Sequence, residues 1–185
     1  MNLSMRLVAF LLIIMLHEKG DKIKPLIGMK HSPFKLKCLA SFFIAFSAFL
    51  GGLVFNLFLT FFKIPGNTPV MKPFLIGLAT FLMSLIVYSG SYKLLKTLAH
   101  FLLFIPLVLN LSLSALFQQA NFWYEFSFSL LFFLISALLF LGIMERVKIA
   151  PIPTFLQGTG IQLIVLFLIF LSLSFFRGVF FQTLF

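Results

Sequence analysis

Charged residues are scarce in this chain, and acidic residues are scarcer still. Only 10% of the 185 residues are charged, and four of these are Asp or Glu. Hydrophobic residues make up 62% of the sequence, and phenylalanine alone occurs 29 times. Since about a quarter of the residues of an ordinary soluble domain are charged, this composition excludes that class and predicts a protein of the lipid bilayer.

Cysteine and closely spaced metal ligands are also lacking. Cys38 is the single cysteine, so a disulfide within the chain and a four-cysteine metal site are both excluded. We interpret it as a small buried apolar residue near the start of a helix. The histidines His17, His31 and His100 have no close ligand spacing, so no metal site is expected. We place His17 and His31 in loops and His100 at the membrane interface.

Catalytic motifs are missing as well. The sequence contains no phosphate-binding glycine loop, no nucleophile elbow and no paired carboxylates. Glu125 and Glu145 fall at the ends of predicted helices, where solvation explains them. The chain therefore offers no catalytic residue of its own, and the sequence leaves open whether it belongs to an enzyme.

Long apolar runs dominate what is present. A bilayer span needs about 20 apolar residues whose backbone groups bond within their own helix. Neither β alternation nor a barrel turn pattern is visible. The sequence therefore predicts an all-α, polytopic membrane helical bundle, with residues 1–185 forming one domain and about six transmembrane helices. The six runs are Leu7–Leu16, Cys38–Phe62, Pro73–Tyr88, Leu98–Phe117, Phe122–Met144 and Ile161–Phe176.

The first apolar run has two interpretations. Arg6 followed by ten apolar residues is similar to the charged and apolar regions of a secretory signal. However, the next five residues are His17, Glu18, Lys19, Gly20 and Asp21, and this mostly polar stretch lacks the small residues of a cleavage site. We therefore favour a retained helix that is short or spans half of the bilayer.

The basic residues gather in alternate loops. Ten of the fourteen Lys and Arg residues fall in the first, third and fifth loops, and four fall on the opposite side. The positive-inside rule places those three loops in the cytoplasm and both termini outside. A topology signal accounts for the excess of +10, so no nucleic-acid partner is expected. The ten residues are Lys19, Lys22, Lys24, Lys30, Lys35, Lys37, Lys93, Lys96, Arg146 and Lys148.

A few polar residues interrupt the apolar runs. Such groups are costly in lipid and usually face the bundle interior, where interhelical hydrogen bonding is their ordinary role. Pro106 precedes Asn110 by four residues and should kink or break the fourth helix. Because transporters place their sites at broken helices, Pro106–Ser114 is the strongest candidate segment. The polar residues are Asn56, Asn110, Ser112, Ser114, Gln162, Ser172 and Ser174.

The connection before the last helix carries a family resemblance. Helix-ending charges at Glu145 and Arg146 precede a turn containing Pro151 and Pro153, and Gly158 and Gly160 should let the chain bend into the next run. The pattern from Met144 to Ile164 resembles the last loop of the six-helix RnfA/NqrE-type subunits. These subunits are shared by the Rnf electron-transport complex and the sodium-translocating NADH:quinone oxidoreductase. The resemblance implies that the first and fourth helices are interrupted near the membrane middle.

Two further motifs extend the resemblance and also depart from it. Ile105–Val108 resembles the family's fourth-helix motif, and Gly28–Phe34 resembles its first-helix motif. The family has a cysteine in each motif, and these cysteines help to hold a two-iron cluster inside the membrane. Ser112 and Ser32 stand at those positions here. Since hydroxyl oxygen is a poor substitute for thiolate, cluster ligation is doubtful and the cofactor is unknown.

The resemblance implies an integral-membrane subunit of a redox-driven, ion-translocating complex in the bacterial inner membrane. Its partners would be the bilayer, a homologous membrane subunit and the other subunits of a hetero-oligomer. One alternative is the small substrate-binding membrane component of a vitamin transporter, which is also a basic six-helix bundle. Another is a structural assembly subunit, which the absent cysteines favour.

Overall fold

The computed structural model describes residues 3–21, 33–62, 71–95, 99–114, 122–150 and 158–180. Within these ranges the chain forms six helices and no strand, which confirms the predicted all-α bundle. The helices are α1 (Leu3–Asp21), α2 (Pro33–Phe62), α3 (Met71–Leu95), α4 (Ala99–Ser112), α5 (Phe122–Val147) and α6 (Thr159–Phe180).

Three of the helices are long and apolar enough to cross a membrane. They are Phe34–Leu59 in α2, Met71–Ser91 in α3 and Trp123–Val147 in α5. The described apolar parts of α1, α4 and α6 are shorter. α1 has 19 residues, and its described apolar part, Val8–Glu18, is shorter than a full span, which agrees with the short helix expected at the start of the chain.

The fourth helix is continuous across its proline. Pro106 is buried inside α4, and the helix runs from Ala99 to Ser112 without a break, so the predicted break is wrong. Proline removes only one backbone donor, and the helices packed around α4 hold it in place.

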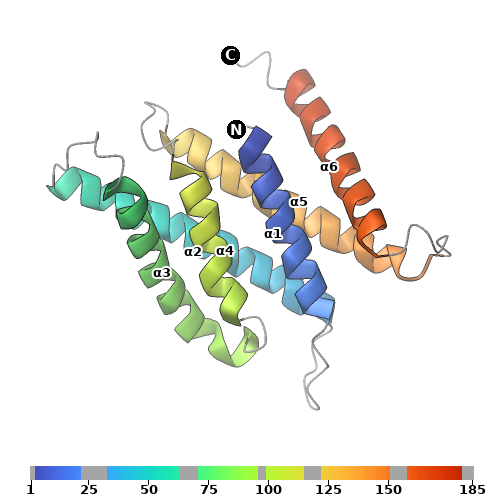
Figure 1. Cartoon of the computed structure of the whole chain (residues 1–185), viewed down its shortest axis with the longest axis horizontal. Coiled ribbons are helices and arrows are strands. Elements are labelled where there is room, and N and C mark those ends of the chain that lie inside the picture. The colour runs from blue at the N-terminus through green and yellow to red at the C-terminus, as the bar shows by residue number, and fades with distance from the viewer. Residues whose placement is uncertain are drawn as a thin grey trace.

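The long helix α2 is the centre of the bundle. It packs against α1, α3, α4 and α5. Figure 1 shows α2 and α5 along the longest dimension of the molecule, with α3 on one flank and α6 on the other. α6 packs on α5 and reaches α1 through an edge-to-face contact between the rings of Phe170 and Phe10, whose centroids are 5.9 Å apart.

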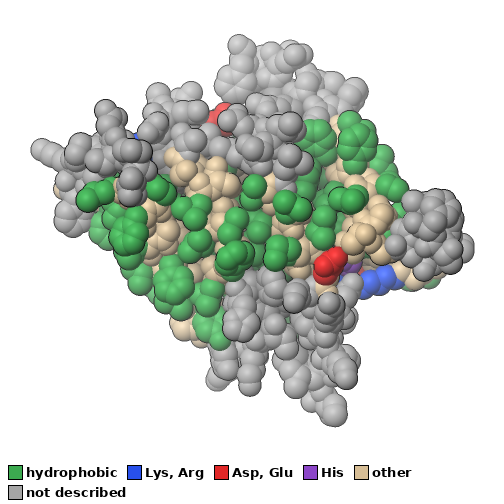
Figure 2. Space-filling view, in the orientation of Figure 1, with side chains coloured by type: hydrophobic (Ala, Val, Ile, Leu, Met, Phe, Trp, Pro, Cys, Tyr) green, Lys and Arg blue, Asp and Glu red, His purple; other side chains and the backbone are tan. Residues whose placement is uncertain are grey.

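Hydrophobic side chains line both the inside and the outside of this bundle. Ile44, Phe126 and Phe133 are fully buried, whereas Phe74 on α3 and Phe167 on α6 are exposed. Figure 2 shows hydrophobic side chains over much of the described face, with charged ones in small groups. Exposed apolar surface this extensive has no place in water, and it fits a bundle surrounded by lipid.

The helix ends alternate between two sides of the molecule. In Figure 1 the ends of α1, α3 and α5 and the starts of α2, α4 and α6 lie along the bottom and right of the molecule, and the opposite ends lie along its left and top. The three connections that carry most of the basic residues follow α1, α3 and α5, so they join helix ends on the same side of the molecule.

The turn after α5 bears out part of the sequence interpretation. The backbone N–H groups of Ile149 and Ala150 donate to carbonyls of the last turn of α5. Gly158 has a φ of 84°, a left-handed conformation that glycine adopts without strain, so the predicted bend there is confirmed. Gly160 instead lies inside α6, and the two prolines lie outside the described residues.

Candidate functional site

Asn110 on α4 ties three helices together near the middle of the bundle. Its side chain is fully buried, and Nδ2 donates to the carbonyl of Ala48 on α2 at 2.9 Å and to Oγ1 of Thr80 on α3 at 2.9 Å. The Thr80 hydroxyl donates its own hydrogen to the carbonyl of Ile76 at 2.7 Å, so its oxygen is left to accept from Asn110. The amide thus fixes α4 against the α2–α3 pair.

Small residues on α2 allow this close packing. A Cβ on Gly51 would lie 2.8 Å from the backbone Cα of Thr80, and one on Gly52 would lie 2.3 Å from the ring of Phe126 on α5. Side chains at these positions would force α3 or the ring away from α2. The two glycines therefore let α2 approach α3 on one face and α5 on another, as small residues do in membrane bundles.

The carbonyl oxygen of the Asn110 side chain takes no part in these two hydrogen bonds. Asn110 Oδ1 is buried and has no hydrogen-bond partner among the described residues, and the same holds for Ser136 Oγ and Gln162 Oε1. A buried polar atom without a partner is costly, so each such atom needs an explanation. Asn110 lies within the segment that the sequence favoured, residues 106–114.

Of the two family cluster positions, only Ser112 lies within the described residues. Ser112 is at the end of α4, and its hydroxyl donates to the carbonyl of Leu109 at 2.7 Å. Ser32 lies outside the described residues. Cys38, the chain's one thiol, lies ten residues before Ala48 on α2, about 15 Å away along the helix.

A two-iron cluster does not fit these residues. The hydroxyl of Ser112 is engaged with its own helix, and Cys38 lies in another helix, α2. Within the described ranges, no three His, Cys, Asp or Glu side chains gather as metal ligands. The thiolates that such a cluster requires are therefore missing from this part of the chain.

Several serines in the helices bond differently from Asn110. Ser172 was expected to face the interior, but it is exposed on α6 and donates to the carbonyl of Leu168 at 2.9 Å. Ser41, Ser47 and Ser84 are buried, yet each likewise donates to a carbonyl of its own helix. These serine hydroxyls donate to carbonyls of their own turns, whereas Asn110 makes the predicted interhelical bonds.

A second polar group, at the basic end of the bundle, was missed from the sequence. His17 is in α1 and not in a loop, because that helix continues to Asp21, and its side chain is only 2% exposed. Lys37, which we counted as a loop charge, is in α2 and is 0% exposed. Lys37 Nζ lies 3.5 Å from His17 Nδ1.

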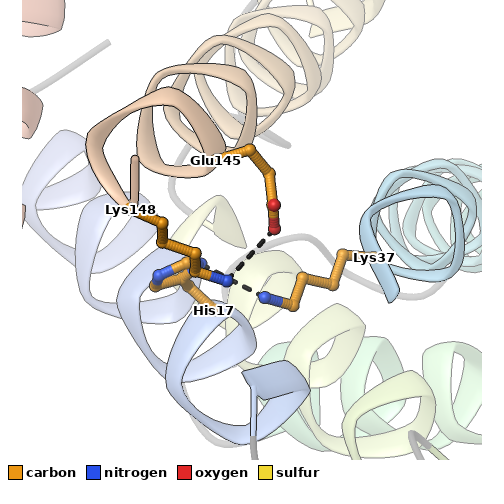
Figure 3. A network of polar contacts seen from close by, with 4 residues as sticks. All are labelled: His17, Lys37, Glu145 and Lys148. Atoms are coloured by element: carbon orange, nitrogen blue, oxygen red, sulfur yellow. Dashed lines mark hydrogen bonds and ion pairs between the residues drawn. The ribbon is translucent and has the colours of Figure 1, made fainter. Parts of the chain in front are cut away.

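Two residues at the end of α5 complete this group. Figure 3 shows His17, Lys37, Glu145 and Lys148 converging between α1, α2 and α5. Lys148 Nζ donates to Glu145 Oε1 at 3.2 Å, with the two side chains 42% and 33% exposed. Glu145 thus sits at a partly solvated helix end, as predicted.

Helical spacing could have revealed the buried lysine. Lys37 precedes Ser41, Ile44 and Ala48 by four, seven and eleven residues, and all three are fully buried. That spacing places Lys37 on the inward face of α2. We had instead counted every basic residue near the loop as solvated.

A comparison of the chain with protein-family models, curated proteins and solved structures finds no match. The RnfA/NqrE resemblance therefore depends on the residues quoted above and on nothing else. The structural features that bear on function are the polar group at Asn110, the polar group at His17 and Lys37, and the apolar surface around them.

Proposed function

We propose that this chain is an integral-membrane subunit of a redox-driven, ion-translocating electron-transport complex. In this proposal it is similar to the RnfA/NqrE type and keeps the helical scaffold without the two cluster ligands. Three helices able to cross a membrane and an apolar outer surface support the membrane location. The α5–α6 connection, where the resemblance is strongest, has its bend at Gly158.

Asn110 is the observation that carries the proposal. Burying an amide in the middle of an apolar bundle costs desolvation free energy, which a leucine at the same position would not cost. One half of the amide is used to hold α2 and α3, but Oδ1 has no partner among the described residues. A polar atom kept at this place favours a role in transport over a purely structural one.

The packing of α4 does not by itself call for a partner subunit, because α4 packs against α1, α2 and α3, and Asn110 donates within the chain. The homologous partner is therefore proposed from the resemblance alone.

Purification from native membranes in a mild detergent tests this proposal. We expect a hetero-oligomer that contains a homologous membrane subunit and a flavin-bearing subunit. The reduced preparation, freed of other cluster-bearing subunits, should give no two-iron signal in low-temperature electron paramagnetic resonance. A stable monomer that binds a vitamin would support the transporter alternative, and a two-iron signal abolished by Cys38→Ala would overturn our placement of the ligands.

A pair of variants separates a transport role of Asn110 from a role in assembly. Asn110→Leu should assemble with its partners but lower redox-driven ion uptake into proteoliposomes. Ser172→Leu, which changes an exposed hydroxyl on α6, is the matched control and should leave uptake unchanged. Equal uptake by the two variants would remove the argument from Asn110.

Membrane topology is tested by reporter fusions. Fusions after Lys96 and Lys148 should report the cytoplasm, and a fusion after Gln119 should report the exterior, because basic loops stay inside. The alternation of the helix ends in Figure 1 supports this arrangement. Matching signals from positions 96 and 119 would contradict the six-helix topology.

A further inference from the structure

We infer that the outward face of α5 next to Arg146 is a docking surface for an anionic phospholipid of the leaflet on the basic side of the bundle. The headgroup phosphate binds Arg146, and an acyl chain lies along Gly142, Leu139 and Ile135. The inference does not depend on the proposed redox function, because it needs only a bundle that sits in a bilayer.

Exposed apolar side chains form a row along one face of α5. Leu131, Ile135 and Leu139 follow one another at four-residue spacing, and all three are exposed. Arg146 is exposed as well, and it lies seven residues after Leu139 and eleven after Ile135. At 3.6 residues per turn these spacings are close to whole turns of the helix. Arg146 therefore lies on the same face, at the end of the apolar row.

This face is about as long as the hydrocarbon core is thick. Near the start of α5, Tyr124 is exposed on the same face, and its ring stacks on that of Phe128 with centroids 6.3 Å apart. Tyrosine is typical of the interface between membrane and water. Arg146 follows Tyr124 by 22 residues, which is about 33 Å along the helix, and the core is about 30 Å thick. Arg146 therefore lies at the level of the opposite headgroups, where its guanidinium can bind a phosphate.

The face has an opening one turn before Arg146. Gly142 lies there, and a Cβ at this position would meet none of the described atoms within 4 Å. The surface of the helix is therefore open beside the guanidinium, and an acyl chain can pass close to the backbone. Ile135 lies about 17 Å from Arg146 along the helix, and one leaflet of the core is about 15 Å deep. One acyl chain thus covers the row from Gly142 to Ile135.

Charge favours an anionic headgroup over a zwitterionic one. The neighbouring carboxylate of Glu145 turns toward α1 and α2, where Figure 3 shows it with His17, Lys37 and Lys148, and it accepts from Lys148 at 3.2 Å. Arg146 lies on the outward face instead, and a guanidinium matches two phosphate oxygens at once. Ten of the fourteen basic residues fall in the connections on this side. An anionic lipid therefore meets complementary charge at the end of the apolar row.

Native mass spectrometry tests this binding on the full chain, titrated in a mild detergent with phosphatidylglycerol or with phosphatidylcholine of the same acyl chains. The first phosphatidylglycerol should bind about fivefold more tightly than the first phosphatidylcholine, or better, because it alone carries a net negative charge. Glycerol phosphate, which has the phosphate without the chains, should not displace it. Equal affinities for the two lipids would overturn the proposal and leave the face to an acidic protein partner. Displacement by glycerol phosphate would also overturn it, since the site would then bind free phosphate.

Arg146→Gln and Lys35→Gln form a matched pair, because each removes one exposed positive charge from the basic side but only Arg146 ends the row on α5. Arg146→Gln should weaken the binding of phosphatidylglycerol by about fivefold. Lys35→Gln, at the start of α2, should weaken it much less. Equal losses would mean that the basic side attracts the lipid without a defined site, and they would overturn the proposal.

A second pair tests the path of the acyl chain without changing any charge. Gly142→Leu fills the opening beside Arg146 and should weaken the binding of phosphatidylglycerol. Gly77→Leu, at a position on α3 that is equally open, should leave the binding unchanged. Both variants should fold, because neither new side chain starts against a neighbour. An unchanged affinity in Gly142→Leu would overturn the placement of the lipid on this face.

Discussion

The two polar groups of this bundle differ in chemistry as well as in place. At the centre, Asn110 offers a neutral amide that donates to α2 and α3 at 2.9 Å. At the basic end, His17 and Lys37 are titratable and lie beside Glu145 and Lys148, which are partly exposed. A neutral amide can be buried at a modest cost once it is hydrogen-bonded, whereas a buried ionisable side chain is costly unless polar groups lie beside it.

The distances between the helix backbones differ in the same way. At the centre, Gly51 brings the backbone of α2 directly against that of α3 at Thr80. At the basic end, the long side chain of Lys37 on α2 reaches His17 on α1. The ring of His17 in turn contacts the ring of Phe140 on α5. At the centre the helices therefore meet backbone to backbone, and at the basic end they meet through long side chains.

The largest expected loss of stability comes from a change at the centre of the bundle, where α2 meets α3. Gly51→Val would place a Cβ 2.8 Å from the Cα of Thr80, so the backbone of α3 must move. We expect the free energy of unfolding to fall by about 3 kcal/mol, at the upper end of the cost of overpacking. Unfolding in mixed micelles with increasing dodecyl sulfate measures it.

Gly77→Val is the control for this change, because a Cβ at Gly77 meets nothing within 4 Å. Its stability should stay close to that of the wild type. Equal losses from Gly51→Val and Gly77→Val would mean that α2 and α3 do not approach each other at Gly51.

A smaller loss is expected from the amide itself. Asn110→Ala removes two interhelical hydrogen bonds, each worth about 0.6 kcal/mol in membrane bundles, and leaves a small cavity. The free energy of unfolding should fall by about 1–2 kcal/mol in the same assay. Ser112→Ala, which removes only a bond to its own helix, should change it far less; an equal effect would argue against the three-helix role of Asn110.

The sequence predicted the bundle more securely than the site. Long apolar runs and scarce charge predict membrane helices because the bilayer demands them, and the six runs correspond to α1–α6. Pro106 did not break α4, since its effect depends on the helices packed around it. Asn110 could be singled out by its type, but its partners Ala48 and Thr80 are distant in sequence and depend on helix packing.

Thr80 gives a finer test of the centre. Thr80→Val keeps the shape of the side chain and removes the oxygen that accepts from Asn110 Nδ2. A loss of about 0.6 kcal/mol is expected for this one interhelical bond. Ser84→Ala, one turn along α3, removes a hydroxyl that bonds only to the carbonyl of Phe81 and should be neutral. Matching losses in the two variants would show that the Thr80–Asn110 bond contributes nothing.

The smallest effect is expected from the solvated pair at the basic end. Glu145 and Lys148 are 33% and 42% exposed, so water and salt screen their attraction. Glu145→Gln and Lys148→Met should each lower the free energy of unfolding by under about 1 kcal/mol, and a double-mutant cycle should give a coupling of about 0.5 kcal/mol or less. Raising the salt concentration should reduce the coupling free energy between Glu145 and Lys148, because that coupling depends on charge. The loss of unfolding free energy from Asn110→Ala should stay unchanged, because the amide is neutral. A coupling that equals the loss from Asn110→Ala and resists salt would mean that the basic end is as closed to water as the centre.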